Sequence, residues 1–138
     1  TPAARLRALE LAQAVGATPI EMHPIRHDRL VAAISHLPYL LSAAMVRTVA
    51  GEGEADPTVW ELAASGFRDT SRLAASDVQM MTDILSTNTT AVARLLALFR
   101  VQLATLEAAL VSRDTEQLQT ILTSAHDARR HWAEEHLK

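Results

Sequence analysis

The spacing of apolar residues predicts helix along most of the chain. From Ile25 onward, apolar side chains recur every three or four residues, as they do on one face of an α-helix. The helix that begins at Ile25 is predicted to run to about Ala50, where Gly51, Gly53 and an Asp-Pro pair indicate a loop. A short helix is expected at residues 58–64, with its Trp and Leu side chains packed in the core.

A second and longer run of the same spacing covers residues 78–111, and Asn88 is its polar exception. A continuous helix of that length would be roughly 50 Å long, whereas a compact chain of this size is about 37 Å across. The helix is therefore expected to extend beyond its own domain, and a second apolar strip along it needs cover. A symmetric partner is the economical cover, so we expect a homodimer.

A final helix is predicted to begin at Asp114, because the spacing to Gln117 matches a capping box. Its apolar stripe would pack back on the long helix. Three histidines follow at a spacing of five, which rotates them onto different faces of the helix. They are therefore expected to face solvent and not to share a metal ion. These residues are His126, His131 and His136.

The first 24 residues differ from the rest of the chain. Residues 3–15 predict a helix, Gly16 is a suitable helix stop, and residues 18–22 predict a short strand. A helix followed by a strand is the closing unit of an alternating α/β domain. We interpret residues 1–24 as the remnant of a dinucleotide-binding domain and residues 25–138 as an all-helical domain. The predicted fold class is mainly α, with two long helices preceded by this helix-strand remnant.

Composition narrows the class of protein. The chain has 138 residues, 49% of them hydrophobic, with a net charge of −3, so it shows no basic excess for nucleic acid. It has no cysteine, which agrees with a reducing cytoplasm. Its most apolar run, residues 37–46, is shorter than the roughly 20 residues of a membrane span. No G-x-G-x-x-G motif occurs, so no cofactor-binding residue is expected in this chain.

Candidate chemistry begins in residues 27–39, HDRLVAAISHLPY, where polar residues interrupt an apolar helical pattern. Pro38 lacks the N–H that would bond four residues back, so a kink is expected around residues 34–38. His36 and Tyr39 are three residues apart and would project together beside the loosened turn. That arrangement suits a polar ligand. The alternative is that both are core residues, with the histidine hydrogen-bonded.

A second stretch, GFRDTSRLAASD at residues 66–77, places ionisable residues among small ones. Arg72 presents a planar fork of donors suited to a carboxylate or phosphate. Asp69 is expected to cap a short helix and, three residues before Arg72, to orient the guanidinium. Asp77 is expected to cap the long helix that follows.

These two stretches, in this order and about thirty residues apart, resemble the C-terminal helical domain of prephenate and arogenate dehydrogenases, the oxidoreductases of tyrosine biosynthesis. The resemblance covers about residues 17–111. It implies a domain that forms the dimer and closes over substrate at the edge of a separate dinucleotide-binding domain. It implies that Arg72 binds a substrate carboxylate with Asp69 as supporting acid, and it places His27 and His36 in the HD and SHLP elements. Many family members carry histidine where this chain has Tyr39.

By this resemblance, the full-length protein would oxidise prephenate or arogenate by hydride transfer to NAD or NADP, with loss of carbon dioxide. The cofactor and the catalytic histidine would lie on the missing domain, so no catalytic residue or metal ligand is expected here. The chain alone would then be inactive. The candidate substrate-binding residues are Arg72, His36, Tyr39, Asp69 and His27. Neither nucleic acid nor a membrane is an expected partner.

Two other functions are compatible with parts of the sequence. His27 and Asp28 form the kind of pair that holds a metal ion in all-helical phosphohydrolases. That fold also needs a further upstream histidine and a downstream aspartate, and His23 lies only four residues away across Pro24. The second alternative is a helical dimerisation module without a catalytic role.

Overall fold

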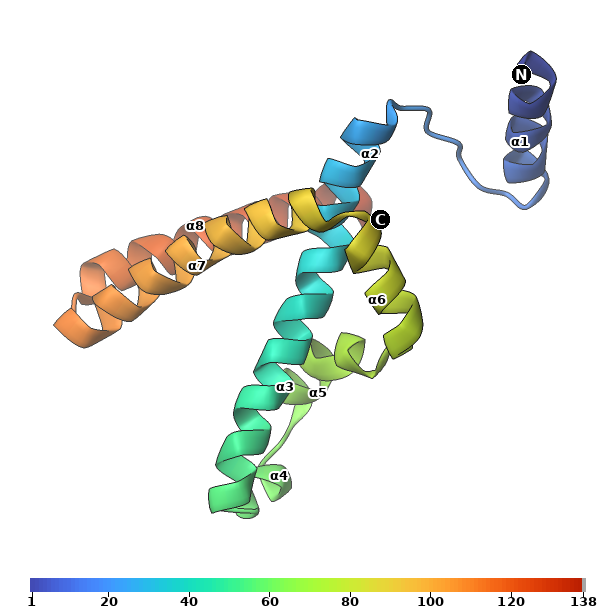
Figure 1. The fold of residues 1–138 in the computed structure, drawn as a ribbon. Helices are drawn as coiled ribbons and strands as arrows, with labels where there is room; N and C mark the ends of the chain where they lie inside the picture. Colours follow the sequence, from blue (N-terminus) through green and yellow to red (C-terminus); the bar gives the residue numbers. More distant parts are fainter. Residues whose placement is uncertain (138) are drawn as a thin grey trace.

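The computed structural model describes residues 1–137 and consists of helices joined by short connections (Figure 1). The mainly α fold class is confirmed, because residues 1–137 contain no strand. The element η1 is π-helical and η2 is a 3-10 helix. In chain order the elements are α1 (Pro2–Ala14), α2 (Pro24–Val31), η1 (Ala32–His36), α3 (Leu37–Ala55), α4 (Thr58–Glu61), α5 (Ser65–Ser71), η2 (Arg72–Ala75), α6 (Val78–Thr87), α7 (Thr89–Ser112) and α8 (Thr115–His136).

The N-terminal helix α1 ends as predicted, at a glycine. Gly16 has a φ of 75°, its N–H donates to the carbonyl of Gln13, and the next N–H donates to the carbonyl of Ala12. This left-handed ending satisfies carbonyl groups that the helix itself leaves open. Figure 1 shows α1 standing apart from the other helices.

The strand predicted at residues 18–22 is wrong, because this segment has no regular secondary structure. An extended segment becomes a strand only when a neighbouring strand takes up its backbone N–H and C=O groups, and residues 1–137 supply none. The segment is instead tied to α1 by a bidentate ion pair, in which Arg5 donates to Glu21 at 2.7 and 2.8 Å. The hydrogen bonds from Arg5 lower the pKa of the Glu21 carboxyl.

The elements α2, η1 and α3 form one long helical rod from Pro24 to Ala55 (Figure 1). The interruption predicted around Pro38 takes the form of the π-helical turn η1. Because Pro38 has no N–H, it cannot bond to the carbonyl of Ile34, and the turn before it widens. The N–H of Leu37 accordingly donates to the carbonyl of Ala32, five residues back.

The prediction that Gly51 and Gly53 end this rod is wrong, since α3 continues to Ala55. Gly53 is needed for a different reason. A Cβ at this position would lie 2.6 Å from Nε1 of Trp60, so the missing side chain lets the α4 indole rest on α3. Trp60 also meets the ring of Phe67 edge to face, with centroids 5.9 Å apart.

The short helix expected at residues 58–64 is only one turn long, Thr58–Glu61. The prediction that Trp60 and Leu62 pack in the core is wrong, because Trp60 is 44% exposed and Leu62 is 78% exposed. The N–H of Thr58 donates to Oδ1 of Asp56 at 3.0 Å, which begins the turn. Hydrogen bonding from the Thr58 side chain, and then from its backbone N–H, lowers the pKa of the Asp56 carboxyl.

The single long helix predicted over residues 78–111 is also wrong. The chain changes direction between α6 and α7 (Figure 1), and Asn88 between them has φ −120° and ψ 29°. Hydroxyl groups next to the break donate to carbonyls of the last turn of α6, which supports the helix end there. These donors are Ser86 to Asp83, Thr87 to Ile84 and Thr89 to Ser86, at 2.9, 2.9 and 3.0 Å.

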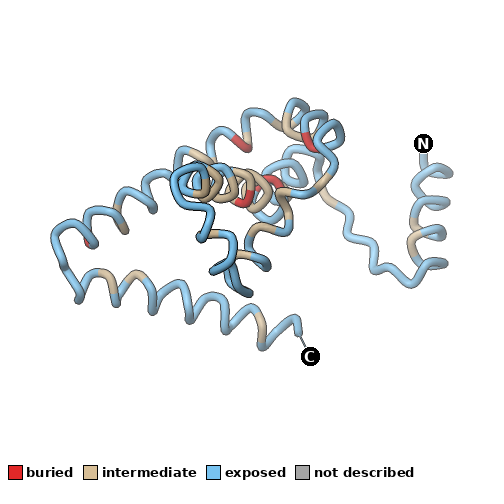
Figure 2. The backbone as a smooth tube through the Cα atoms, turned by 90° about the horizontal axis from the view of Figure 1, so that it is seen from below, coloured by how far each residue is buried: buried red, intermediate tan, exposed pale blue. Residues whose placement is uncertain are grey.

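The helices α7 and α8 form an antiparallel hairpin that extends away from the other elements (Figures 1 and 2). At 24 residues, α7 is about 36 Å long. The predicted start of α8 is confirmed, because the N–H of Gln117 donates to Oδ1 of Asp114 at 2.9 Å. The length argument for an overhang does not hold for α7, which is about as long as a compact chain of this size is wide, but the α7/α8 hairpin does extend beyond the other helices (Figure 1).

The core of the chain is small. Figure 2 shows most buried positions gathered where the helices cross, while α1 and α8 are exposed over most of their lengths. The buried hydroxyl of Ser42 on α3, 1% exposed, accepts a hydrogen bond from the N–H of Ala74 at 2.9 Å. This bond fixes η2 against α3. The buried residues are Ala32, His36, Ser42, Met81, Val92 and Ala109.

Large apolar surfaces remain open on this chain. An open groove of about 750 Å³ runs between α3 and α7, and several large apolar side chains of α7 are at least half exposed. The rod Pro24–Ala55 and the helix α7 are each long and apolar enough to cross a membrane by length and composition. The most apolar run, residues 37–46, did not indicate this. The groove is lined by Pro38, Leu41, Met45, Val49, Leu73, Phe99 and Leu103, among others.

The two glycines of α3 offer a matched test of the Trp60 contact. Gly51→Ala meets nothing within 4 Å and should raise the free energy of unfolding by about 0.5–1 kcal/mol, the usual gain for alanine over glycine in a helix. Gly53→Ala should not give this gain and should shift Trp60 fluorescence, measured in a Trp132→Phe background. Equal stabilisation by both substitutions would contradict the contact.

The Ser42 bond predicts a second stability difference. Ser42→Ala leaves the N–H of Ala74 without its acceptor and should lower the free energy of unfolding by about 1–3 kcal/mol, measured by urea titration. Ser124→Ala, at an exposed position of α8, is the control and should be neutral. If Ser42→Ala is as stable as the control, the bond does not hold η2 in place.

Candidate functional site

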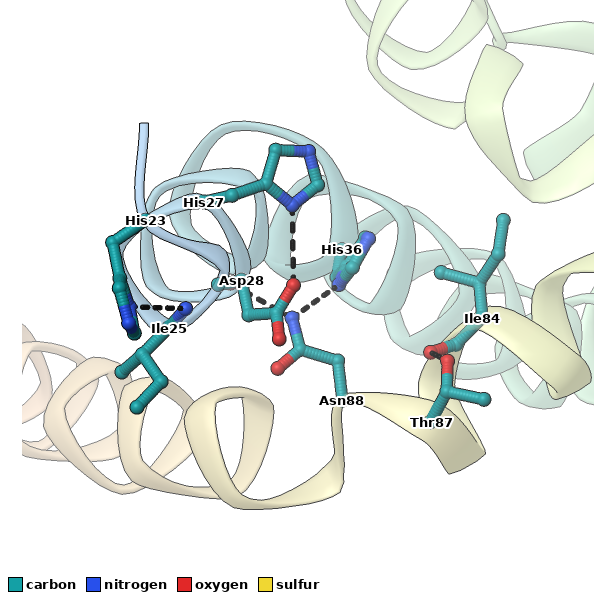
Figure 3. Close-up of polar contacts among 8 residues, drawn as sticks. All are labelled: His23, Ile25, His27, Asp28, His36, Ile84, Thr87 and Asn88. Atoms are coloured by element: carbon teal, nitrogen blue, oxygen red, sulfur yellow. Dashed lines mark hydrogen bonds and ion pairs between the residues drawn. The ribbon is translucent and has the colours of Figure 1, made fainter. Parts of the chain in front are cut away.

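The histidine in the π-helical turn is directed into the molecule. His36 is only 7% exposed, and its Nδ1 lies 3.3 Å from the side-chain nitrogen of Asn88 (Figure 3). The same nitrogen of Asn88 donates to the backbone carbonyl of Asp28 at 2.8 Å. A single amide at the α6/α7 break therefore contacts both α2 and η1, which are 60 and 52 residues away in the chain.

An open groove of about 390 Å³ lies around this contact. His27 stands on one wall, with its Nδ1 3.1 Å from Oδ1 of Asp28, and both side chains are exposed. The groove combines imidazole, hydroxyl and amide groups with two aliphatic side chains, so it can bind a small ligand that has both apolar and hydrogen-bonding parts. Its lining residues are His27, Asp28, Val31, Ser35, His36, Ile84, Thr87 and Asn88.

A second open groove of about 650 Å³ adjoins the first and shares Asp28, Thr87 and Asn88 with it. Two guanidinium groups, those of Arg29 and Arg94, line this groove together with hydroxyl side chains. Guanidinium groups favour anionic ligands, so the polar surface around the α6/α7 break extends beyond the two histidines.

The second candidate stretch lies elsewhere. Arg72 is the first residue of η2, its side chain is exposed, and it has no hydrogen bond or ion pair with residues 1–137. The prediction that Asp69 caps a helix is wrong, because Asp69 lies inside α5. Its Oδ1 accepts from Nε of Arg68 at 3.0 Å, so its ion-pair partner is not Arg72. Asp77 does cap α6, accepting from the N–H of Met80 at 2.7 Å.

The structure thus brings together some of the predicted site residues. His27 and His36 line the same groove. Asp69 lines the apolar groove between α3 and α7. Tyr39 is half-buried on α3, and neither it nor Arg72 lines the groove around His36. Sequence reasoning noted Asn88 only as a polar exception in an apolar stripe, and that exception was the signal for its role.

The metal-site interpretations find no support in residues 1–137. No group of three or more His, Cys, Asp or Glu side chains is placed to hold a metal ion there, so the phosphohydrolase alternative is not supported. The three histidines of α8 are exposed, as predicted. One of them, His136, has its Nδ1 2.9 Å from the carbonyl of Trp132 and stacks on the indole ring.

Comparison with known proteins matches this chain to one family model and to dehydrogenases. The model of one protein family, described as the dimerization domain of prephenate dehydrogenase, matches residues 23–124. A prephenate dehydrogenase of Bacillus subtilis is 39% identical over 69 residues, which is 50% of this chain and 19% of that relative. A cyclohexadienyl dehydrogenase of Zymomonas mobilis is 31% identical over 104 residues, which is 75% of this chain and 36% of that relative.

Two solved structures share the fold. A Synechocystis arogenate dehydrogenase superposes with a TM-score of 0.82 at 28% identity, covering 96% of this chain and 48% of its own. A prephenate dehydrogenase from A. aeolicus, in complex with hydroxyphenyl propionate and NAD+, gives 0.79 at 28% identity, covering 92% and 45%. The chain spans less than half the length of each of these four relatives.

Proposed function

Because the chain belongs to the family of prephenate dehydrogenase dimerization domains, we propose that it is the C-terminal part of an NAD(P)-dependent prephenate or arogenate dehydrogenase. The match over residues 23–124 is the observation that carries the proposal. In that reaction a hydride leaves the substrate for the nicotinamide and carbon dioxide is lost. Prephenate then gives 4-hydroxyphenylpyruvate, and arogenate gives tyrosine.

The nicotinamide site is proposed to lie on a preceding domain. The four glycines of this chain are dispersed and form no phosphate-binding loop, so the residues present do not fit a dinucleotide. Residues 1–24 are proposed to belong to that preceding domain, and residues 25–138 to form the dimerisation and substrate domain. The A. aeolicus complex, which holds NAD+, supports NAD as the cofactor.

The contribution proposed for this chain is substrate binding. Arg72 is exposed and has no ionic partner among residues 1–137, which leaves its guanidinium open to a substrate carboxylate. The imidazoles of His27 and His36 would form one side of the substrate cleft, and Tyr39, which lies outside the groove around His36, would contact the substrate from α3. Asp69 would influence Arg72 only through the short segment that joins them, because its carboxylate pairs with Arg68.

The chain is proposed to act as a homodimer. The apolar groove between α3 and α7 and the exposed face of the α7/α8 hairpin need cover, and the family match is to a dimerization domain. A second copy can cover the two membrane-length helices as well as a bilayer could, without placing the charged side chains of α8 in lipid. A dimerisation module without catalytic role remains the alternative for a chain of this length.

Sedimentation tests the dimer. We expect a mass twice the 15.0 kDa of one chain at micromolar concentration, and Leu103→Glu in the α3/α7 groove should shift it towards the monomer, since a buried carboxylate is costly. Thr123→Glu, at an exposed position of α8, is the control and should leave the mass unchanged. A monomer mass that does not depend on concentration would exclude the homodimer, and partition of the chain into liposomes would favour a membrane partner.

Kinetics of the full-length enzyme test Arg72. Hydrogen bonds from a guanidinium to a carboxylate contribute about 1.5–3 kcal/mol, so Arg72→Ala should raise KM on the order of tenfold to a hundredfold. The value of kcat should change much less, because substrate and transition state both carry the carboxylate. Arg72→Lys should restore KM only partly.

The matched control is Arg68→Ala, which removes a neighbouring guanidinium that is already paired with Asp69. It should leave KM unchanged. An unaltered KM for Arg72→Ala, with a loss of thermal stability only, would assign Arg72 a structural role. Absence of any prephenate or arogenate oxidation by the full-length protein would reject the proposed function itself.

A further inference from the structure

The contacts of Asn88 determine which nitrogen of His36 carries its proton. The backbone carbonyl of Asp28 can only accept a hydrogen bond, so the Asn88 atom 2.8 Å from it must be the amide nitrogen. That nitrogen only donates, and it also lies 3.3 Å from Nδ1 of His36. Nδ1 must therefore be the unprotonated acceptor. A neutral imidazole has one N–H, which then resides on Nε2.

The second ring nitrogen of His36 remains open to the groove. Among residues 1–137, no buried side-chain nitrogen or oxygen lacks a hydrogen-bond partner. The one hydrogen bond of the His36 ring is made through Nδ1, so Nε2 is not fully buried, and His36 lines the groove of about 390 Å³. Figure 3 shows this nitrogen on the side of the ring away from Asn88.

We propose that Asn88 is a positioning residue that holds His36 with its proton on Nε2, so that the groove presents a fixed N–H donor to an oxygen atom of the ligand. The ligand oxygen would belong to a carboxylate, carbonyl or hydroxyl group. This inference rests on the proposed function, in that the ligand is the substrate of the dehydrogenase. The break between α6 and α7 then has a purpose beyond packing, since it directs the amide of Asn88 at the imidazole.

The geometry distinguishes this role from a purely structural one. A residue needed only to join the α6/α7 break to α2 would require the bond to Asp28 alone. The bond to Nδ1 of His36 adds nothing to that connection, but it removes one of the two neutral forms of the ring. A donor with a fixed position loses less conformational freedom when ligand binds.

The tautomer can be measured without substrate. In histidine-labelled full-length protein, nitrogen NMR separates protonated from unprotonated ring nitrogens, and His36→Gln assigns the signals. At a pH about two units above the ordinary histidine pKa of about 6.5, we expect the His36 proton on Nε2. Asn88→Asp, which is similar in size but offers no donor, should move the proton to Nδ1. A wild-type His36 protonated on Nδ1 would overturn the proposal.

Asp28→Asn is the matched control for this measurement. It changes the side chain next to His27 but keeps the backbone carbonyl to which Asn88 donates. The tautomer of His36 should therefore not change. If Asp28→Asn moves the proton as Asn88→Asp does, then local charge and not the amide contact sets the tautomer, and the proposal fails.

Kinetics of the full-length enzyme then test the use of the donor. The amide nitrogen of glutamine reaches close to the position of Nε2, whereas that of asparagine reaches only that of Nδ1. His36→Gln should therefore retain most of the substrate affinity, while His36→Asn and Asn88→Asp should raise KM up to roughly tenfold, the loss of one neutral hydrogen bond. Thermal melts of each variant correct for any unfolded fraction.

The outcomes separate the inference from the function on which it rests. If the protein oxidises neither prephenate nor arogenate, the proposed function is rejected, whatever the NMR spectrum shows. If the protein is active and His36→Asn is as good as His36→Gln, Nε2 is not the donor and the positioning role alone is rejected. An active protein with the Gln variant preferred and the proton on Nε2 supports both.

Discussion

One side-chain amide, that of Asn88, connects the parts of this chain that are far apart in sequence. It bonds the carbonyl of Asp28 and meets the ring of His36. It does so from a backbone conformation that ends one helix and starts the next. Without that break, α6 and α7 would continue in one direction, and the amide would not face the π-helical turn. The placement of the polar groove and the direction of the α7/α8 hairpin both depend on this residue.

The small core sets a second condition. Few side chains are fully buried, and the links between α3 and the shorter helices are specific contacts: the hydroxyl of Ser42 with the N–H of Ala74, and the indole of Trp60 over Gly53. Such contacts fix orientation but remove little apolar area from water. The apolar groove between α3 and α7 stays open within this chain, which is consistent with the match to a dimerization-domain model.

The site is consistent with a chain that supplies only part of a cleft. The groove around His36 offers hydrogen-bonding groups, and Arg72 stands exposed on a separate element. An unpaired guanidinium and a buried, oriented imidazole do not form a closed pocket within one chain. Under the proposed function, residues outside this chain would complete the cleft, and the chain spans less than half of each solved relative.

The sequence by itself determined what depends on local spacing. Apolar periodicity indicated a mainly helical chain, although not the extent of each helix. Cap residues indicated the helix ends at Gly16, Asp77 and Asp114, because capping involves residues three or four positions apart. The resemblance in two motifs gave the family, which the comparisons confirm.

Tertiary structure decided what depends on distant partners. Residues 18–22 need a neighbouring strand to become one, and no described residue provides it. Gly53 is explained only by the indole of Trp60. Local hydroxyl groups support the helix end at Asn88, but the direction of its side-chain amide is explained by groups more than fifty positions earlier. Periodicity reflects the spacing of residues within one helix, so it does not indicate the role of a polar residue whose hydrogen-bond partners lie on another helix.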